Sequence, residues 1–294
     1  MNTRRWTAAA LVPLLFGLSS CSIKQLVADN MTGLLEEVEA SFLDEPSYQY
    51  GREAGSSLLM MLEGVIASSP GNEDLLVLGT RMNAQYALAF VEAEGDETFA
   101  RSLYGKALDY GLRALDDEEL NEALKGNAAG VAAALEEYDE DDVPLLFWTG
   151  LAYGSWINVN RDSVRAIADL PNAVAFMDRV IELDPTYFHG GAYLFKGQYH
   201  GRGGREIGGD PDLARESLMK AIEISEGRFL LAKVYLARFY AVPTQNQELY
   251  DELLFEVLEA PDDVLPGESL ATAVAKHQAE RLLLEAEDYF LAGS

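Results

Sequence analysis

The chain has 294 residues, of which 49 are acidic and 22 are basic, so its formal net charge at pH 7 is −27. This charge disfavours nucleic acid and anionic lipid surfaces as partners, and a hydrophobic content of 49% excludes a disordered acidic tail. The length is sufficient for a large core, in one elongated domain or in two compact ones.

The first 20 residues have the three-part layout of a secretory signal peptide. A basic head, Arg4 and Arg5, precedes an uncharged and mostly apolar run at 8–18, and two serines follow that run. The run is too short to span a bilayer, which needs roughly 20 residues. We therefore predict that residues 1–20 are a signal peptide.

Cys21 is the only cysteine of the chain, which excludes an intramolecular disulfide and a four-cysteine metal site. It ends the segment Leu18-Ser19-Ser20-Cys21, which resembles the lipobox of bacterial lipoproteins. In a lipobox the cysteine is acylated and becomes the first residue of the mature protein. The pattern predicts that Cys21 carries a lipid anchor; the alternative is an ordinary cleavage site followed by a chance cysteine.

This prediction divides the chain into three parts. Residues 1–20 are the signal peptide, residues 21–45 are the lipidated N-terminus and a tether, and residues 46–294 are the folded body. In bacterial lipoproteins an aspartate after the cysteine tends to retain the protein in the inner membrane, and here the residue is Ser22. For a Gram-negative source we therefore expect attachment at the periplasmic face of the outer membrane.

The folded body is predicted to be all-α. No stretch shows sustained period-two alternation, whereas apolar side chains recur at helical spacing, as in Leu213, Ala214, Leu218, Ala221 and Ile222. Short segments rich in Pro, Gly and Asp interrupt the pattern at regular intervals and are typical of helix ends. We expect roughly ten to twelve helices of about 12–20 residues.

Pairs of these helices repeat. The segment 176–185 (FMDRVIELDP) is similar to 217–226 (SLMKAIEISE), and each follows a helix rich in Gly, Ala and aromatic residues. A small-plus-aromatic helix followed by an amphipathic one resembles tetratricopeptide (TPR) architecture, although the spacing and the consensus positions match only in part. The sequence therefore predicts an α-helical solenoid of antiparallel pairs, degenerate TPR-like, in which neighbouring pairs complete each core.

The segment 143–160 carries no charge and approaches the length of a membrane span. Pro144, Gly150, Gly154 and Asn158 dilute its apolar character. We interpret it as a central helix that neighbouring helices bury.

Residues for catalysis or metal binding are not evident. His189, His200 and His277 are scattered without metal-ligand spacing, and no Gly-x-Ser-x-Gly elbow marks a nucleophile. The acidic run at 138–142 could bind calcium but lacks the loop pattern of such sites, so a helix cap is the preferred interpretation. We predict no enzyme activity, no metal and no cofactor.

The loop at 201–211 (GRGGREIGGDP) combines glycines with arginines, which could indicate a phosphate site. It lacks the spacing of known phosphate-binding loops. The competing interpretation is a turn between helices, in which Asp210 caps the next helix and Pro211 occupies its first turn.

Three segments resemble one known family, the T component of TRAP transporters (TatT). They are GGDPDLARESLMKAIEISEGRFLLAKVYLARFYA (208–241), VPLLFWTGLAYGSWI (143–157) and VIELDPTYFHGGAY (180–193). The resemblance implies a periplasmic TPR-like lipoprotein with a helical solenoid fold, a possible homotrimer, and a periplasmic solute-binding protein as partner. Gly208, Gly209, Asp210 and Pro211 match the Gly-Gly-Asp-Pro segment of that family and are treated as structural.

A ligand cleft in such a protein would draw on aromatic residues of the inner helices. The candidates are Trp148, Tyr153, Trp156, Tyr193 and Tyr199. Core packing is the competing interpretation for each of them, because aromatics at helical spacing mostly fill interiors.

The function implied by the resemblance is an accessory role in TRAP-type uptake, in which the protein docks the solute-binding protein and hands over an apolar or organic-acid ligand. A TPR-like scaffold lipoprotein for outer-membrane or cell-wall assembly is the first alternative. A hydrolase or lipid carrier with a helical fold is the second.

Overall fold

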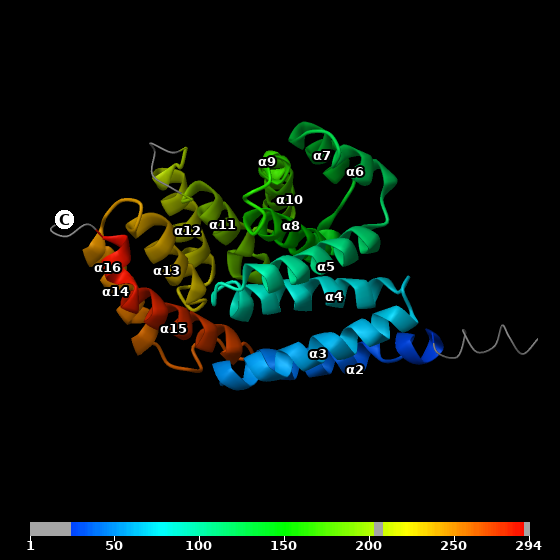
Figure 1. Cartoon of the computed structure of the whole chain (residues 1–294), viewed down its shortest axis with the longest axis horizontal. Coiled ribbons are helices and arrows are strands. Elements are labelled where there is room, and N and C mark those ends of the chain that lie inside the picture. Colours follow the sequence, from blue (N-terminus) through cyan, green and yellow to red (C-terminus); the bar gives the residue numbers. More distant parts are fainter. Residues whose placement is uncertain (1–24, 203–207, 291–294) are drawn as a thin grey trace, which may run out of the picture.

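The computed structural model describes residues 25–202 and 208–290 (Figure 1). Within these ranges the regular structure is entirely helical, so the predicted all-α fold class is confirmed. The longer helices are α2 (Thr32–Leu43), α3 (Tyr48–Ser68), α4 (Glu73–Tyr86), α5 (Glu97–Leu115), α7 (Ala128–Leu135), α8 (Val143–Asn158), α10 (Leu170–Leu183), α11 (Tyr187–His200), α12 (Pro211–Ile224), α14 (Gln247–Glu259) and α15 (Ser269–Leu284). The shorter elements are η1 (Ala87–Val91), α6 (Glu118–Ala123), η2 (Glu140–Asp142), α9 (Val164–Ala168), α13 (Leu231–Leu236), η4 (Ala237–Ala241) and α16 (Ala286–Tyr289).

Polar side chains start many of these helices at the interruptions seen in the sequence. Ser47, Asn72 and Asp96 each accept a hydrogen bond from a backbone N–H in the first turn of α3, α4 and α5. Such caps satisfy a donor that has no partner inside the helix, and each contributes about 1 kcal/mol to stability. The turns between helices are therefore encoded locally.

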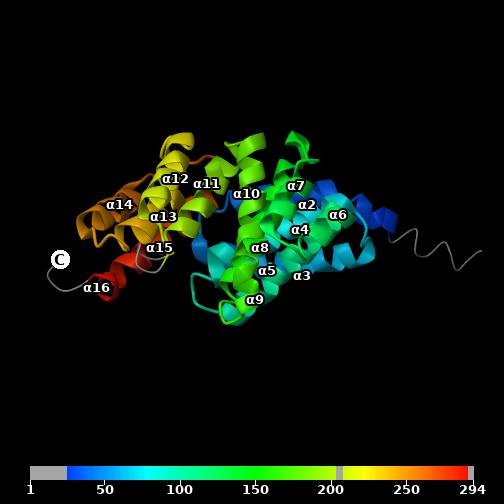
Figure 2. The same cartoon turned by 90° about the horizontal axis from the view of Figure 1, so that it is seen from above.

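Consecutive helices pack side by side in an array that curls back on itself. α3 packs on α4, α4 on α5, α5 on α8, and α8 on α10; the order continues through α11, α12, α13 and α14 to α15. α15 then contacts α2, α3 and η1, so the last long helix lies against the first ones (Figures 1 and 2). The array of helix pairs is thus closed.

Three apolar clusters stabilise the array. One is centred on α8 and α10, another joins α2–α5 to α15 through Leu270 and Val274, and the third fills the space among α11–α15. Each fully buried Leu, Val or Phe side chain contributes roughly 1.5–3 kcal/mol relative to exposure. The second cluster shows that the closure of the array is part of the core.

The uncharged segment forms α8, whose residues are almost all buried. Glycines let neighbouring helices approach it: a Cβ atom on Gly150 would lie 2.6 Å from the Cβ of Phe176, and one on Gly154 would lie 2.3 Å from Phe195. The interpretation of this segment as a central buried helix is confirmed. Within the described ranges, no helix has the length and apolar character needed to cross a membrane.

One backbone pattern occurs near both ends of the array. η1 and η4 are both π-helical, each is followed by a turn with a left-handed residue (Gly95, φ 79°; Gln245, φ 55°), and each turn ends in an N-cap residue (Asp96; Asn246). π-helical turns are rare in proteins, and those that do occur are often found at functional sites. The two π-helical turns lie on either side of the cavity described next.

Candidate functional site

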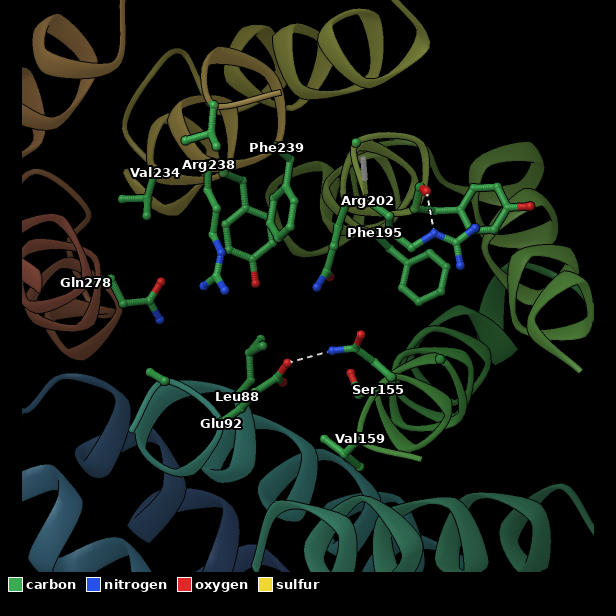
Figure 3. Close-up of a pocket in the computed structure, with 18 of the residues that line it drawn as sticks. Leu88, Glu92, Ser155, Val159, Phe195, Arg202, Val234, Arg238, Phe239 and Gln278 are labelled. Carbon is green, nitrogen blue, oxygen red and sulfur yellow. Dashed lines mark hydrogen bonds between the residues drawn. The ribbon is translucent and has the colours of Figure 1, made fainter. Parts of the chain in front are cut away.

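A cavity of about 890 Å³ lies inside the closed array. Its walls come mainly from the C-terminal parts of η1, α8, α11, η4 and α15, which the closure of the array brings together (Figure 3). Four acidic and four basic side chains line it: Glu92, Glu94, Glu97, Glu285, Arg161, Arg202, Arg238 and Arg281. The cavity is therefore polar in a molecule whose other packed spaces are apolar.

Several of these charges neutralise one another. Arg281 Nη2 lies 3.0 Å from Glu285 Oε1, and the hydroxyl of Tyr289 donates to the same carboxylate at 2.7 Å. The bond from Tyr289, followed by that from Arg281, lowers the pKa of Glu285. Glu94 pairs with Arg52, which is outside the cavity lining. Both carboxylates therefore already have arginine partners within the protein.

The pair between Glu97 and Arg161 is looser. Their nearest charged atoms are 3.9 Å apart, and both side chains are about two-thirds exposed, at 66% and 69%. An exposed pair at this distance contributes little to stability. It marks the solvent-facing rim of the cavity.

Glu92 is held by neutral donors rather than by a cation. Tyr104 Oη donates to Glu92 Oε2 at 2.6 Å, and Asn158 Nδ2 donates to Oε1 at 2.9 Å. The pKa of Tyr235, whose side chain also lines the cavity, is raised by burial and then by the negative charge of Glu92. Glu92 therefore presents a fixed, oriented carboxylate on one wall.

Arg202 and Arg238 lie across the cavity from Glu92 (Figure 3). Arg202 donates from Nε to the carbonyl oxygen of Tyr199 at 2.9 Å, and its guanidinium lies 4.3 Å from the centre of the Tyr199 ring. Arg238 lies beside the Phe239 ring at 5.5 Å. Among the described residues, the contacts of the two guanidinium groups are with these aromatic rings and with a backbone oxygen, and not with a carboxylate.

An apolar cavity of about 100 Å³ adjoins the polar one. The two cavities share the side chains of Leu88, Phe195, Gln198, Tyr235 and Gln278 as walls. The remaining lining of the smaller cavity is dominated by aromatic and aliphatic residues from η1, α8, the start of α11 and α15. A polar and an apolar compartment thus meet at a common wall.

Strained backbone lies at the apolar cavity. Phe188, His189 and Gly190 all have left-handed conformations, with φ of 47°, 57° and 78°. For the two residues that carry a Cβ, this conformation costs roughly 1–2 kcal/mol each. The Phe188 ring packs against Trp148 and Phe229, with centroids 4.8 Å and 5.5 Å away. This packing compensates for the strain.

His189, the residue after Phe188, contacts a residue that lines the same cavity. His189 Nε2 lies 2.9 Å from Glu268 Oε1, a residue of the cavity lining that precedes α15. The His189 ring also stacks on Phe229 at 4.9 Å. The α10–α11 turn is therefore tied to the α14–α15 turn.

The structure places two of the five aromatic candidates at the cavities. Trp148 lines the apolar cavity and donates from Nε1 to the hydroxyl of Tyr187 at 3.1 Å, and Tyr199 lines the polar cavity beneath Arg202. Tyr153, Trp156 and Tyr193 line neither cavity and pack against the apolar clusters instead. A role of any of the five in binding a ligand stays a prediction.

The glycine-rich loop has a local structural role at its C-terminal end. Gly208 has a φ of 88°, and the carboxylate of Asp210 accepts hydrogen bonds from the backbone N–H groups of Asp212 and Leu213. Pro211 is the first residue of α12, and Gly209 lies between the left-handed residue and the cap. The residues 203–207 lie outside the described ranges, as does Cys21.

The sequence drew attention to Arg202 only as part of the glycine-rich loop 201–211 and did not single out Glu92 or Arg238. Glu92, Arg202 and Arg238 lie far apart in the chain, and only the closure of the array brings them to one space. One feature of the chain recurs near these residues. A π-helical turn followed by a polar cap occurs at 87–96 and again at 237–246. It is a backbone feature that residue types alone do not reveal.

The fold and the cavity define a class of protein: a closed array of TPR-like helix pairs that encloses a polar chamber with an apolar side pocket. The part of the chain that the structure describes holds no group of His, Cys, Asp or Glu residues arranged for a metal ion. The chain belongs to the TRAP transporter T-component family, and the match covers residues 48–290. No curated protein matches the chain.

Membership in this family gives the protein an accessory role in a TRAP transporter and associates it with the cell envelope. The matched range includes the helices that form both cavities.

Proposed function

We propose that this protein is a lipid-anchored periplasmic T component that docks the solute-binding protein of its transporter and exchanges a ligand with it through the polar cavity. The observation that carries the proposal is the cavity itself, in a chain that belongs to a family of transporter components. A chamber that joins polar and apolar compartments is suited to hold a small molecule in transit.

The anchor and the location complete the proposal. The lipobox-like segment before Cys21 supports attachment through a lipid. The predicted tether, residues 21–45, is shorter than expected, because residues 32–43 form α2 and belong to the folded body. Ser22 supports the periplasmic face of the outer membrane. A homotrimer, which the family resemblance implies, would display three such cavities at one membrane site.

The docking surface that fits this role is the rim of the polar cavity at α9. Val164 of this helix is 83% exposed and Ile167 is 47% exposed, and Ile167 also lines the cavity. Apolar side chains beside an opening are typical of protein interaction sites. A solute-binding protein seated there would face the chamber directly.

The experiment is a direct binding measurement between the purified protein and the solute-binding protein of the same transporter. The double variant Val164→Glu/Ile167→Glu should weaken the complex by about tenfold or more, because two charges would be buried in the interface. Met60→Glu, at a residue of α3 that is 77% exposed and outside both cavities, is the matched control. Full binding by the double variant would exclude α9 as the docking surface.

Absence of any complex, together with recovery of outer-membrane barrels or cell-wall enzymes from periplasmic extract, would favour the assembly-scaffold alternative. A binding stoichiometry measured by light scattering would report the oligomeric state at the same time.

A further inference from the structure

We propose that the N-terminal end of the helical array rests on the membrane itself, with the side chains of Leu26, Val27 and Leu34 in the headgroup region of a zwitterionic phospholipid surface. This inference rests on the lipid anchor of the proposed function. It adds the part of the folded body that the anchor brings against the lipid.

Three large apolar side chains near the start of the described chain are exposed. Leu26 and Val27 lie in the helical turn at residues 25–29 and are 61% and 55% exposed, and Leu34 in the first turn of α2 is 61% exposed. A single exposed leucine is ordinary, whereas exposed apolar side chains that gather in one short segment are typical of a protein or membrane interaction site.

The turn at residues 25–29 is fixed to the folded body. Ala28 is buried in the second apolar cluster. Asp29 Oδ1 accepts hydrogen bonds from Ser69 Oγ at 2.7 Å and from Asn72 Nδ2 at 2.8 Å, and both donors lie in the turn between α3 and α4. The two exposed side chains of this turn therefore belong to the surface of the folded body.

The position of the anchor selects a membrane as the partner of this surface. Gln25, the first described residue, follows Cys21 by four positions. Four residues span at most roughly 14 Å even when fully extended. An acyl chain on Cys21 therefore keeps the turn at 25–29 close to the lipid headgroups, where burial of exposed apolar side chains in the interface is favourable.

The charge of the segment decides which lipid surface fits. Residues 25–43 contain four acidic side chains and no basic one. Segments that bind anionic lipids carry clusters of Lys and Arg, so electrostatic attraction cannot hold this segment, and anionic headgroups would repel it. Burial of the apolar side chains is the remaining favourable contribution, and it is available at a zwitterionic surface.

The opposite end of the molecule provides matched controls. α14 and α16 lie at the other end of the longest axis from the start of the described chain (Figure 1). Phe255 of α14 is 53% exposed, and Leu284, the last residue of α15, is 86% exposed. Both are exposed apolar side chains that the anchor does not bring to the membrane.

The experiment measures lipid contact by spin labelling of the acylated protein in phosphatidylcholine vesicles. A nitroxide is attached to Val27→Cys, Leu34→Cys or Phe255→Cys, and its relaxation is measured with oxygen, which concentrates in lipid, and with a neutral nickel chelate, which stays in water. Acylation of Cys21, the only native cysteine, leaves the introduced thiol to react. The ratio of oxygen to nickel accessibility at the first two positions should exceed that at the third by at least about threefold.

Two changes should lift the labelled surface from the lipid. Leu26→Glu should raise the nickel accessibility of the Leu34 label by about threefold, because a carboxylate is costly to bury in the interface. Vesicles of phosphatidylglycerol at low salt should act in the same direction through repulsion. Leu284→Glu is the control and should leave the Leu34 label unchanged.

Two results would overturn the proposal. Labels at Val27 and Leu34 that are as accessible to nickel as the label at Phe255 would show that water covers this surface. Labels that are shielded from both reagents, and equally so before vesicles are added, would show that a second copy of the chain covers it.

Intact mass measurement separates this inference from the anchor on which it rests. An acylated protein with water-exposed labels means that the surface is wrong and the anchor stands. If the mass shows no acyl chain, Cys21→Ser keeps a single thiol for labelling. Lipid-exposed labels on that protein mean that the surface is correct and the anchor is wrong, and water-exposed labels mean that both are wrong.

Discussion

The rings of Tyr48 and His277 stack with their centroids 3.8 Å apart and an interplanar angle of 19°. Tyr48 begins α3 and His277 lies in α15, so this stack joins the two ends of the helical array. Nearby, Ser269 Oγ donates to Asp44 Oδ1 at 2.9 Å. The closure that encloses the cavity thus depends on specific contacts as well as on apolar burial.

Removal of this stack should weaken the closure. His277→Ala is expected to lower the free energy of unfolding by about 1 kcal/mol, because an aromatic pair contributes 0.5–1.5 kcal/mol beyond its buried area. Chemical denaturation measures the change. Tyr50→Ala, on the same helix as Tyr48 but 62% exposed, is the control and should leave stability nearly unchanged.

The same residue makes the closure sensitive to pH. Burial, followed by the positive charge of Arg281, lowers the pKa of His277 below its usual value of 6.5. The unfolded state therefore takes up a proton first, and stability falls as the pH drops from about 6.5 toward the folded-state pKa, below which this contribution is constant. His277→Phe keeps an aromatic ring and lacks the titration. The wild type should lose more stability than this variant between pH 7.5 and pH 5, and parallel profiles would contradict the prediction.

Glu39 and Arg81 form an ion pair that fixes α2 to α4. Arg81 donates from Nε to Glu39 Oε1 at 2.7 Å, and the Glu39 side chain is only 5% exposed. Arg81→Met would leave a buried carboxylate without its cation, at a cost of about 3 kcal/mol. The double variant Glu39→Leu/Arg81→Met should recover much of that loss, as a double-mutant cycle in urea would show. If Arg81→Met lost almost no unfolding free energy, the ion pair would not be needed for stability.

Low pH should reduce the defect of Arg81→Met. Burial raises the pKa of Glu39 even with the opposing effect of Arg81, and loss of the arginine removes that opposition. A carboxyl group with a raised pKa is protonated more readily in the folded state, so the penalty is largest well above that pKa and falls as the pH decreases through it. Comparison of the variant with the wild type at pH 8 and pH 5 tests this sign.

Gly201 allows α11 and η4 to meet at the cavity wall. A Cβ atom at this position would lie 2.2 Å from the carbonyl oxygen of Phe239, a backbone atom that cannot rotate away. Gly201→Ala should therefore destabilise the protein by about 1–3 kcal/mol. Gly64→Ala is the counterpart within α3, where an added Cβ has nothing within 4 Å; it should stabilise by about 0.5–1 kcal/mol. Thermal unfolding of the two variants should shift in opposite directions.

The anchor makes a cellular prediction. Cys21→Ala should release the protein into the soluble periplasmic fraction or leave an unprocessed precursor, because the lipid would have no attachment site. Fractionation and intact mass measurement distinguish these states from the acylated protein. A mature-sized variant that remains in the membrane fraction would contradict the lipobox interpretation.

The sequence predicted the fold more fully than the site. Caps such as Asn72 and Asp210 and the glycines of α8 act within a few residues or one helix contact, so their patterns are visible in the chain. The placement of Glu92 and Arg238 in the lining of one cavity depends on how far the array curls, which is a sum of many small packing angles. No local pattern encodes that sum.

The sequence patterns also did not predict the left-handed turn at Phe188 and His189. The structure begins α11 at Tyr187 and puts a kink at residues 188–190. The aromatic contacts of Phe188 with two other elements outweigh the local preference of its backbone. Tertiary packing, which acts beyond a sequence window, decides the conformation at this position.

The contact of α15 with α2 and α3 has a consequence for how the molecule comes apart. An open row of repeats can fray from either end, because each terminal unit has a neighbour on one side only. Here each end shields the other, so the array has no terminal pair that can open without breaking contacts at both ends of the chain. Amide hydrogens of α3 and α15 should therefore exchange at rates as slow as those of α8.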